Sequence, residues 1–245
     1  MGLTPTLRPM LMVGSWLERL FKRHPLVVGE EAWMGLEAPA VPAEEAEQVE
    51  GAVLGRRVAF ATGRWCARRA LARLEIPSFI LRNGADRAPR WPPGVVGSIT
   101  HAGSVPGGFC GVVVGRSSHW MTLGLDAERG DALDPELWPL VLTPNESAWL
   151  GSQALSARRI LASLVFSAKE SFYKAQFPLT GRFLDFTDVE VTVDLQQLAF
   201  EARLSGKVSE GDAFLRVCKG HFLTSERFVL TGIAVPARSL SVASA

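Results

Sequence analysis

The spacing of apolar residues along the chain predicts an alternation of helices and short strands. In a strand every second side chain points to the same face, so alternating apolar residues indicate extended structure. Strands are predicted over 95–101, 108–114, 121–128, 188–193, 198–204, 213–217 and 228–235. The last four are expected to form an antiparallel meander with one face covered by helices.

Apolar residues spaced three or four apart predict two long helices. One is expected over 44–74, opening on four glutamates, with a buried stripe of Leu54, Val58, Ala61 and Trp65. The other is expected over 157–175, ending before Pro178 because proline disrupts helices.

Shorter segments give local signals of their own. Thr143 and Glu146 have the spacing of a capping box, so a helix is expected to begin there. A short helix is predicted over 15–23, a loop over 36–43, and weak structure over 1–14. Asn83-Gly84 is a strong turn signal.

Composition narrows the class of protein. The chain has 245 residues, 47% of them hydrophobic, which suffices for one large domain or two small ones. Its formal net charge is +1, so the total charge calls for neither nucleic acid nor an anionic membrane. Nine arginines nevertheless fall between 56 and 90, where a local anion site is plausible.

The cysteines and the lengths of the hydrophobic runs indicate the cellular compartment of the protein. Three widely spaced cysteines form neither a disulfide framework nor a zinc pattern. No run reaches membrane-spanning length, and Pro9, Gly14 and Glu18 interrupt any signal-peptide core. We therefore expect a cytoplasmic protein.

Asp126 and Glu128 are the first candidates for chemistry. They are two residues apart on the strand predicted over 121–128, so both carboxylates leave the sheet on one face while Leu125 faces the core. Two carboxylates this close repel each other unless a cation lies between them, and oxygen ligands suit Mg²⁺ or Mn²⁺. An isolated pair of this kind is usually two solvated acids, so a third carboxylate matters.

The helix predicted over 157–175 can supply that carboxylate. Phe166, Glu170 and Lys174 recur every four residues and share one face, with Lys169 a little further round. A surface ion pair between Glu170 and Lys174 is the simpler interpretation. The apolar residues of this helix argue for a buried position, in which its polar groups must face a partner.

Ser98, Thr100 and His101 form a second polar cluster. A Ser/His hydrolase is excluded by the absence of a G-x-S-x-G elbow and of an obvious acid to orient His101. A histidine at a strand end is more often structural than catalytic. Beside a phosphate, however, Ser98 and His101 would be suitable hydrogen-bond donors.

Three segments taken together resemble the signature motifs of the 4′-phosphopantetheinyl transferases. They are Trp-Pro-Pro-Gly-Val-Val-Gly-Ser-Ile-Thr-His at 91–101, Gly-Leu-Asp-Ala-Glu at 124–128 and Phe-Ser-Ala-Lys-Glu-Ser-Phe-Tyr-Lys-Ala at 166–175. Their order and spacing are similar to the larger surfactin- and enterobactin-synthetase type. Segments 63–71 and 177–180 resemble the enterobactin-like branch with its actinobacterial members. The similarity spans roughly residues 50 to 195.

The resemblance implies a set of roles. Asp126, Glu128 and Glu170 would hold Mg²⁺, with Mn²⁺ as an alternative, and Asp126 would also lie against the substrate coenzyme A. Glu170 would be the general base, and Lys174 and Lys169 would contact phosphate. The other residues expected to bind coenzyme A are Arg56, Arg64, Arg82, Arg87, Ser98, Thr100 and His101. The helical wheel places Arg57 and Arg68, not Arg56, on the flank of Arg64, so the choice between Arg56 and Arg57 stays open.

The resemblance also implies a fold and partners. We expect an α+β protein of two similar α/β lobes, 1–119 and 120–245, related by a pseudo-twofold within a single chain. Coenzyme A would lie between the lobes, and the acceptor would be an acyl or peptidyl carrier protein of fatty-acid, polyketide or nonribosomal peptide synthesis. We expect a monomer that binds neither nucleic acid nor membrane. Two competing hypotheses remain, another Mg²⁺-dependent phosphohydrolase or nucleotidyl transferase and a non-catalytic carrier-binding scaffold.

Overall fold

Two antiparallel sheets and the helices packed on them make up the protein. The computed structural model describes residues 15–205 and 215–237. The strands are β1 (Val28–Trp33), β2 (Val95–Ala102), β3 (Phe109–Arg116), β4 (Trp120–Arg129), β5 (Val189–Asp194), β6 (Ala199–Leu204), β7 (Cys218–Thr224) and β8 (Phe228–Pro236). The α-helices are α1 (Trp16–Leu20), α2 (Ala43–Ala46), α3 (Leu54–Arg73), α4 (Trp138–Val141), α5 (Pro144–Gly151) and α6 (Arg158–Thr180). Among the described residues no helix is both long and apolar enough to span a membrane.

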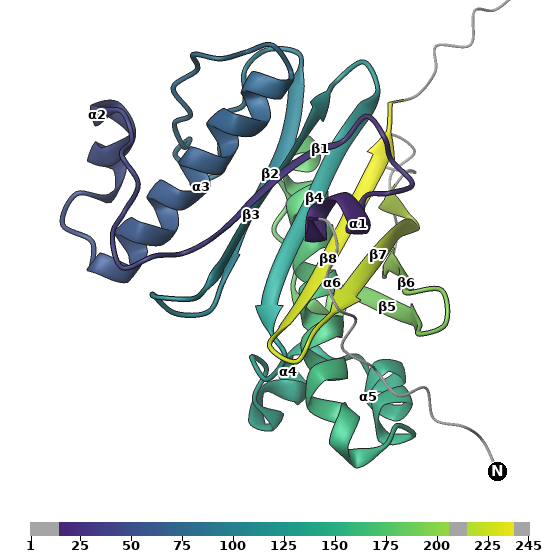
Figure 1. The fold of residues 1–245 in the computed structure, drawn as a ribbon. Helices are drawn as coiled ribbons and strands as arrows, with labels where there is room; N and C mark the ends of the chain where they lie inside the picture. The colour runs from purple at the N-terminus through teal and green to yellow at the C-terminus, as the bar shows by residue number, and fades with distance from the viewer. Residues whose placement is uncertain (1–14, 206–214, 238–245) are drawn as a thin grey trace, which may run out of the picture.

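The same topology occurs twice along the chain. The first sheet has the order β1-β3-β2, with α3 between β1 and β2 in sequence, and the second has the order β4-β8-β7-β6-β5, with α6 following β4. In both, the last strand lies beside the first, and a long helix packs on the sheet (Figure 1). The hairpin β5–β6 extends the second sheet. The expected α+β fold of two similar halves is confirmed, and we propose the lobes 1–119 and 120–245, divided at the turn between β3 and β4.

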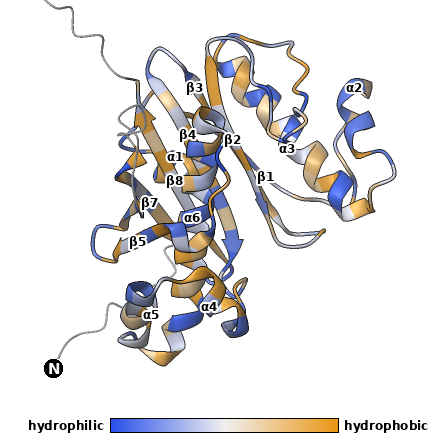
Figure 2. Cartoon of the chain, turned by 180° about the vertical axis from the view of Figure 1, so that it is seen from behind, coloured by the Kyte–Doolittle hydropathy of each residue, from blue (hydrophilic) through white to orange (hydrophobic). Residues whose placement is uncertain are grey.

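The five-stranded sheet is covered on both faces. Helix α6 packs on one face, and α1 lies on the other, in front of β4 and β8 (Figure 1). Hydrophobic residues dominate β8, which lies between β4 and β7 (Figure 2). The meander β5–β8 is confirmed, but the expectation that helices cover a single face is wrong, because Trp16 and Leu20 of α1 are buried against Leu123 and Leu230 of the sheet.

The predicted helix over 44–74 is two helices. Helix α2 passes into a 3₁₀ turn, η1 (Glu47–Val49), and α3 begins only at Leu54. Gly51 lies between them with φ +76°, a left-handed conformation that ends a helix. The acidic residues Glu44, Glu45 and Glu47 therefore lie on a separate short segment and not on α3.

The buried stripe of α3 also differs from the prediction. Leu54 and Trp65 are 59% and 37% exposed, whereas Val58 and Ala61 are buried. Small residues at the buried positions allow close packing on the first sheet. A Cβ at Gly63 would lie 3.2 Å from Ile99.

Helix α6 continues past Pro178 and ends at Thr180, and Gly181, with a φ of +63°, provides a left-handed cap. Proline in the last turn leaves only the carbonyl of Lys174 without its helical partner, so the helix is not broken there. The capping box of Thr143 and Glu146 is confirmed at the start of α5.

One strand is misplaced by the sequence. Of the predicted strand over 213–217, residues 213 and 214 lie outside the described residues, and 215–217 precede β7. The observed strand β7 has Lys219 and Gly220 in place of a clear apolar alternation. The prediction of weak structure over 1–14 also falls outside the described residues.

Side-chain hydroxyls join the two sheets. Strand β2 runs beside β4 without belonging to its sheet. The backbone N–H of Leu125 donates to Ser98 Oγ at 3.0 Å, and that of Ala127 donates to Thr100 Oγ1 at 2.9 Å. The core continues across this junction, since Phe109 of β3 and Phe228 of β8 lie in one cluster. The junction fixes β4 relative to the first sheet.

Candidate active site

Asp126 lies where β2, β4 and α6 meet. Strand alternation turns Leu125 and Ala127 into the core shared with α1, and turns Asp126 towards α6. Gly124 permits this close approach, because a Cβ there would lie 2.0 Å from the carbonyl oxygen of Ser171 on α6. The carboxylates of the strand are thus brought against the helix that carries Glu170.

Lys174 is the direct partner of Asp126. Its Nζ donates to Asp126 Oδ1 at 2.6 Å, and the Thr100 hydroxyl donates to the same oxygen at 3.3 Å. The other oxygen, Oδ2, is buried and has no hydrogen-bond partner among the described residues. A buried carboxylate oxygen without a donor is costly, so Oδ2 is a candidate ligand for a cation.

The three acidic side chains perturb one another. Burial and the nearby Asp126 raise the pKa of Glu128 to about 8, with a further contribution from Glu170. Burial and Asp126 also raise the pKa of Glu170, while Lys174 lowers it. Carboxylates held this close favour protonation unless a cation is present.

The residues present fit a divalent cation. The donor set is all oxygen, one ligand atom is orphaned, and the carboxylates repel one another, as Mg²⁺ or Mn²⁺ sites require. In the described part of the chain, however, no group of three or more acidic, histidine or cysteine side chains is arranged to hold a metal ion. The acids share one neighbourhood, with Lys174 at its centre.

A cleft of about 740 Å³ lies next to the acids, between α3 and β2 of one half and α6 of the other. Its cationic and imidazole lining comes from Arg56, Arg64, Arg87, Arg90, His101 and Lys174. Aromatic side chains contribute apolar walls, including Tyr173 and Phe177, which stack at 5.3 Å between ring centroids. A cleft with this lining suits an anionic ligand with an aromatic or apolar part.

Arg56 and Arg64 both line the cleft, and Arg57 does not. Arg56 Nη1 lies 3.4 Å from His101 Nε2, while Arg57 points to a separate pocket behind α3. The helical-wheel preference for Arg57 beside Arg64 is therefore wrong. Arg64 curls back over the ring of Phe60, so the positions of Cα atoms on the wheel do not locate its guanidinium.

Arg64 is an unusually buried cation. It is 4% exposed, its Nη2 donates to Asn83 Oδ1 at 2.5 Å, and its Nε has no hydrogen-bond partner among the described residues. Burial lowers its pKa to about 10. A desolvated guanidinium with a free N–H and no carboxylate bonded to it is suited to bind an anion.

The polar cluster at the end of β2 divides in two. His101 and Ser98 line the cleft, and removal from water together with Lys174 and Arg56 lowers the pKa of His101. Thr100 is buried, with its hydroxyl bonded to Asp126 and Ala127. The structure thus places Thr100 behind Asp126, not on the cleft wall as expected, although Ser98 on the same β4-facing side of β2 does line the cleft.

Lys169 does not reach the site. Its ammonium donates to Glu146 Oε2 at 2.7 Å and to the carbonyls of Val141 and Phe186, which uses all three of its protons. It is buried against α4 and α5, whereas Lys174 faces Asp126 on β4. The expectation that Lys169 contacts phosphate is therefore wrong.

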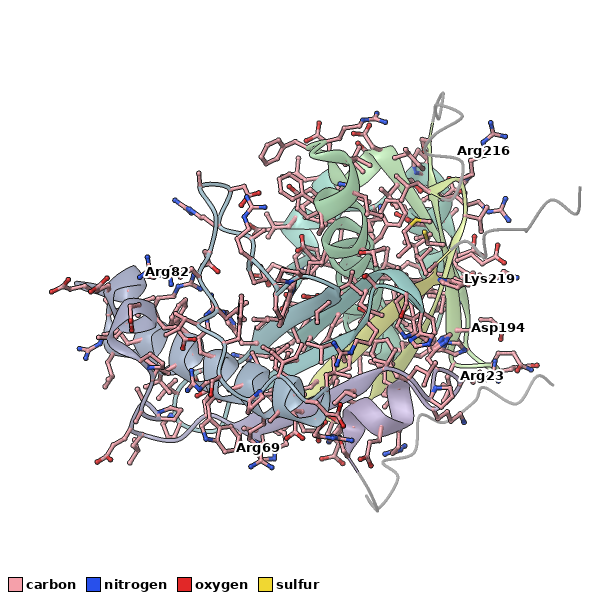
Figure 3. The ribbon with its side chains drawn as sticks, turned by 90° about the horizontal axis from the view of Figure 1, so that it is seen from above. Arg23, Arg69, Arg82, Asp194, Arg216 and Lys219 are labelled. Atoms are coloured by element: carbon pink, nitrogen blue, oxygen red, sulfur yellow. The ribbon has the colours of Figure 1, made fainter. Side chains whose placement is uncertain are left out.

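Arg82 is also displaced from its expected place. It is exposed and does not line the cleft. Figure 3 shows it at the outer edge of the molecule beside α2. In the extended segment 80–83, Arg82 and Asn83 face opposite ways, so Asn83 turns towards Arg64 and Arg82 turns outward. Arg87 does line the cleft, as expected.

Sequence reasoning missed several residues of the cleft. Asn83, Arg90, Trp91 and Tyr173 all line it. The turn signal at Asn83 predicts only backbone geometry, whereas in the structure its amide oxygen accepts a hydrogen bond from Arg64. Tyr173 is adjacent to Lys174 and could have been found from that position.

The arrangement is typical of a site that handles phosphate esters, and comparison with known proteins agrees. Residues 44–115 match the model of the 4′-phosphopantetheinyl transferase N-terminal domain, and residues 122–228 match that of the 4′-phosphopantetheinyl transferase superfamily. The chain is 44% identical over 202 residues to the 4′-phosphopantetheinyl transferase Svp of Streptomyces mobaraensis, covering 79% of this chain and 78% of the relative.

Two further relatives bear related names. The 4′-phosphopantetheinyl transferase Npt of Nocardia iowensis is 34% identical over 85% of this chain and 97% of its own length. The 4′-phosphopantetheinyl transferase PptT of Mycobacterium tuberculosis is 34% identical over 78% of this chain and 85% of its own length. The chain therefore belongs to the 4′-phosphopantetheinyl transferase superfamily and is an enzyme of that class. The expected resemblance to its actinobacterial members is confirmed.

Proposed function

We propose that the enzyme transfers 4′-phosphopantetheine from coenzyme A to a serine of an acyl or peptidyl carrier protein and releases adenosine 3′,5′-bisphosphate. The observation that carries the proposal is the position of Asp126, Glu128 and Glu170 beside a cleft lined with cations from both halves of the chain. Such a cleft matches a substrate with a pyrophosphate and a further phosphate.

The cations divide between the two ends of this substrate. Arg64 and Arg56 would bind the 3′-phosphate of the nucleotide, since Arg64 has a free buried N–H and Arg56 lies beside it on the cleft wall. Lys174 and His101, next to Asp126, would lie against the pyrophosphate. Arg87 lies on the loop that closes the nucleotide end.

Asp126, Glu128 and Glu170 would hold Mg²⁺ or Mn²⁺. A bound cation there would neutralise the charge of the pyrophosphate and the charge that develops on the leaving phosphate. The orphaned Asp126 Oδ2 and the raised pKa of Glu128 support this assignment.

Glu170 is the proposed general base. In the transfer, the carrier serine Oγ forms a bond to the phosphorus next to pantetheine, and the bond from that phosphorus to the bridging oxygen of the nucleotide breaks. The serine proton passes to the Glu170 carboxylate, and the electron pair leaves with adenosine 3′,5′-bisphosphate. Burial and Asp126 raise the pKa of Glu170, which makes it a stronger base than a solvated glutamate.

The remaining expectations are part of the same proposal. We propose a monomer, since both walls of the cleft come from one chain, acting in the cytoplasm on carrier proteins of fatty-acid, polyketide or nonribosomal peptide synthesis. The family membership argues against a non-catalytic scaffold and against an unrelated phosphohydrolase.

Mass spectrometry tests the function directly. The purified chain, incubated with coenzyme A, Mg²⁺ and a panel of apo carrier proteins, should add the mass of phosphopantetheine to at least one carrier. Glu170→Gln should abolish the addition. A carrier panel left entirely unmodified would contradict the proposal, and so would nucleotide turnover in the absence of any carrier.

A further inference from the structure

The short helical turn formed by α2 and η1, residues 43–49, contacts the loop 80–90, which closes one end of the cleft. We call this turn the brace. Glu45 Oε1 accepts a hydrogen bond from the backbone N–H of Leu81 at 3.0 Å, and Gln48 Oε1 accepts one from the backbone N–H of Asn83 at 2.7 Å. Acceptors three residues apart on a helical turn share a face, and N–H groups two residues apart on an extended segment do so too. The turn thus supplies the acceptors that a neighbouring strand would otherwise provide.

The brace is anchored to α3. Glu45 is completely buried, and its second carboxylate oxygen accepts from Arg68 Nη1 at 2.5 Å. Arg68 also donates to the carbonyl of Ala40, three residues before α2 begins. Because Glu45 contacts both α3 and the loop, Gln48 is held in place opposite Asn83.

Asn83 transmits this placement to Arg64. Gln48 accepts from the backbone N–H of Asn83, a residue that also pairs with Pro89 across the loop. The side-chain oxygen of Asn83 receives the 2.5 Å hydrogen bond from Arg64 Nη2. The guanidinium of Arg64 stacks 4.2 Å from the centroid of the Phe60 ring. One hydrogen bond and one stacking contact therefore define its direction.

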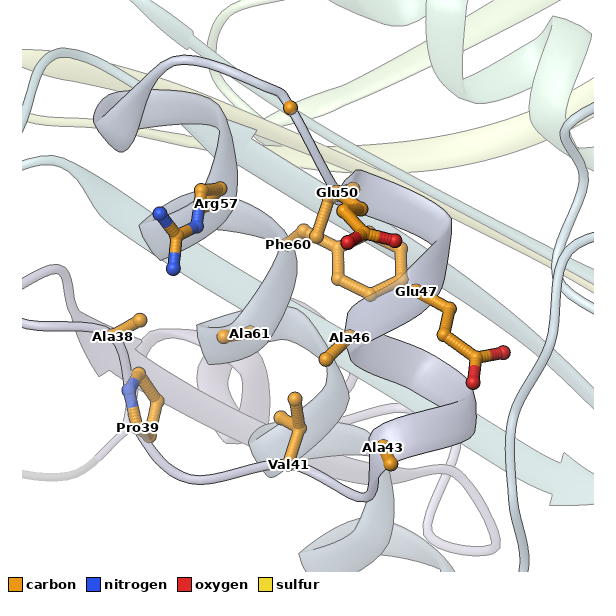
Figure 4. A pocket seen from close by; sticks show the side chains of 12 residues that line it. Ala38, Pro39, Val41, Ala43, Ala46, Glu47, Glu50, Arg57, Phe60 and Ala61 are labelled. Carbon is orange, nitrogen blue, oxygen red and sulfur yellow. The ribbon is translucent and has the colours of Figure 1, made fainter.

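The other side of Phe60 faces the brace. Phe60 lines both the cleft and an apolar pocket of about 540 Å³ beneath the turn. Figure 4 shows the ring of Phe60 beside Ala46 of the turn, with the carboxylate of Glu47 directed outward. The turn thus supports both contacts that orient Arg64.

We propose that Gln48 is a positioning residue that sets the affinity for the 3′-phosphate of coenzyme A, acting through Asn83 and Arg64. The inference rests on the proposed function, in which Arg64 binds that phosphate. Without the Gln48 acceptor, the backbone N–H of Asn83 loses its hydrogen bond, and Asn83 is held less firmly. Its side-chain oxygen then no longer orients the guanidinium of Arg64. The pyrophosphate and the acidic trio, which Gln48 does not touch, are unaffected.

Comparing two substrates provides the test. Gln48→Met keeps the length of the side chain and removes the acceptor. We expect the KM for coenzyme A to rise about fivefold, as for the loss of one hydrogen bond, with kcat unchanged. The KM for 3′-dephospho-coenzyme A should stay at the wild-type value, because that substrate lacks the group that Arg64 contacts.

Glu47→Met is the matched control. Glu47 lies next to Gln48 on the same turn, is exposed, and makes no side-chain hydrogen bond in the part of the chain that the structure describes. It should leave both KM values unchanged. Thermal melting of the two variants shows whether either substitution disturbs folding.

The possible results distinguish failure of the proposed role of Gln48 from failure of the proposed transfer activity. An equal rise of KM for both substrates would show a merely structural effect and overturn the role of Gln48, as would an unchanged KM for coenzyme A. If the wild-type protein transfers phosphopantetheine but does not distinguish the two substrates, the link from Arg64 to the 3′-phosphate is wrong. A wild-type protein that transfers nothing refutes the proposed function itself, and the inference with it.

Discussion

Lys174 donates a 2.6 Å hydrogen bond to Asp126 Oδ1, and this pair connects α6 to β4 at the centre of the site. The lysine is partly exposed, whereas the aspartate is almost completely buried. The ammonium therefore faces the cleft on one side and offsets the charge of the acids on the other.

Replacing Lys174 should impair catalysis more than folding. Lys174→Met removes a cation from the proposed pyrophosphate site, and we expect kcat to fall about 100-fold, in the range seen when one stabilising donor is lost. Steady-state transfer to an apo carrier measures the effect. Lys219→Met is the control, since Lys219 is exposed on β7 and pairs with Glu201 (Figure 3). Equal losses in both variants would contradict the assigned role.

Glu128 should make stability depend on pH. Its pKa is about 8 in the folded protein against 4.5 when unperturbed, so the folded state binds the proton more tightly. Its favourable contribution is complete below pH 4.5 and is lost as pH rises through 8. Glu128→Gln removes this loss, and without divalent cations it should be more stable than wild type by about 4 kcal/mol at pH 8.5 and nearly equal to it near pH 4.5.

Thermal melting across this pH range, with and without Mg²⁺, measures the difference. A bound cation favours the charged carboxylate, so Mg²⁺ should raise the melting temperature of wild type most at high pH and that of Glu128→Gln much less. A stability difference between variant and wild type that does not change with pH would exclude burial of the Glu128 charge and its repulsion by Asp126 as the cause.

Gly124 should tolerate no side chain. A Cβ would lie 2.0 Å from the carbonyl oxygen of Ser171, so Gly124→Ala forces β4 away from α6, and we expect a loss of about 3 kcal/mol in the free energy of unfolding. Denaturant unfolding tests this. Gly55→Ala is the matched control, since a Cβ on Gly55 meets nothing within 4 Å and alanine favours a helix, so it should be neutral or stabilising.

Lys169 should matter for stability and not for substrate binding. Lys169→Met leaves Glu146 buried without its cation, and a loss of about 3 kcal/mol is expected. The KM for coenzyme A of the remaining folded protein should stay unchanged, in contrast to a residue that contacts phosphate. The double variant Lys169→Met with Glu146→Gln should regain part of the stability. A raised KM with unchanged stability would restore the original expectation.

The sequence predicted the elements of the site better than the directions of its long side chains. Strand alternation placed Asp126 and Glu128, and helical spacing placed Glu170 and Lys174, because both periods are fixed by backbone geometry. Lys169 is a neighbour of Glu170 in sequence, yet its direction depends on Glu146, a contact that no local pattern reveals.

Features set by tertiary contacts were beyond the sequence. A single glycine is tolerated in many helices, so the sequence alone does not show that the helix breaks at Gly51. The break depends on tertiary contacts that reverse the chain direction there. The choice between Arg56 and Arg57 depended on how far Arg64 curls over Phe60. Strand β7 was missed because its partners on the sheet, not its own alternation, keep it extended.

At the junction of the two sheets, backbone N–H groups of β4 donate to the hydroxyls of Ser98 and Thr100 on β2 instead of to backbone carbonyls. Thr100 also donates a hydrogen bond to Asp126. The walls of the cleft on either side of this junction carry Arg56 and Lys174. Any widening of this junction would move Asp126 away from the cations that we propose bind the two ends of coenzyme A. Separation of the two halves of the chain would therefore also abolish transfer activity. The transfer rate thus reports whether the two halves remain docked.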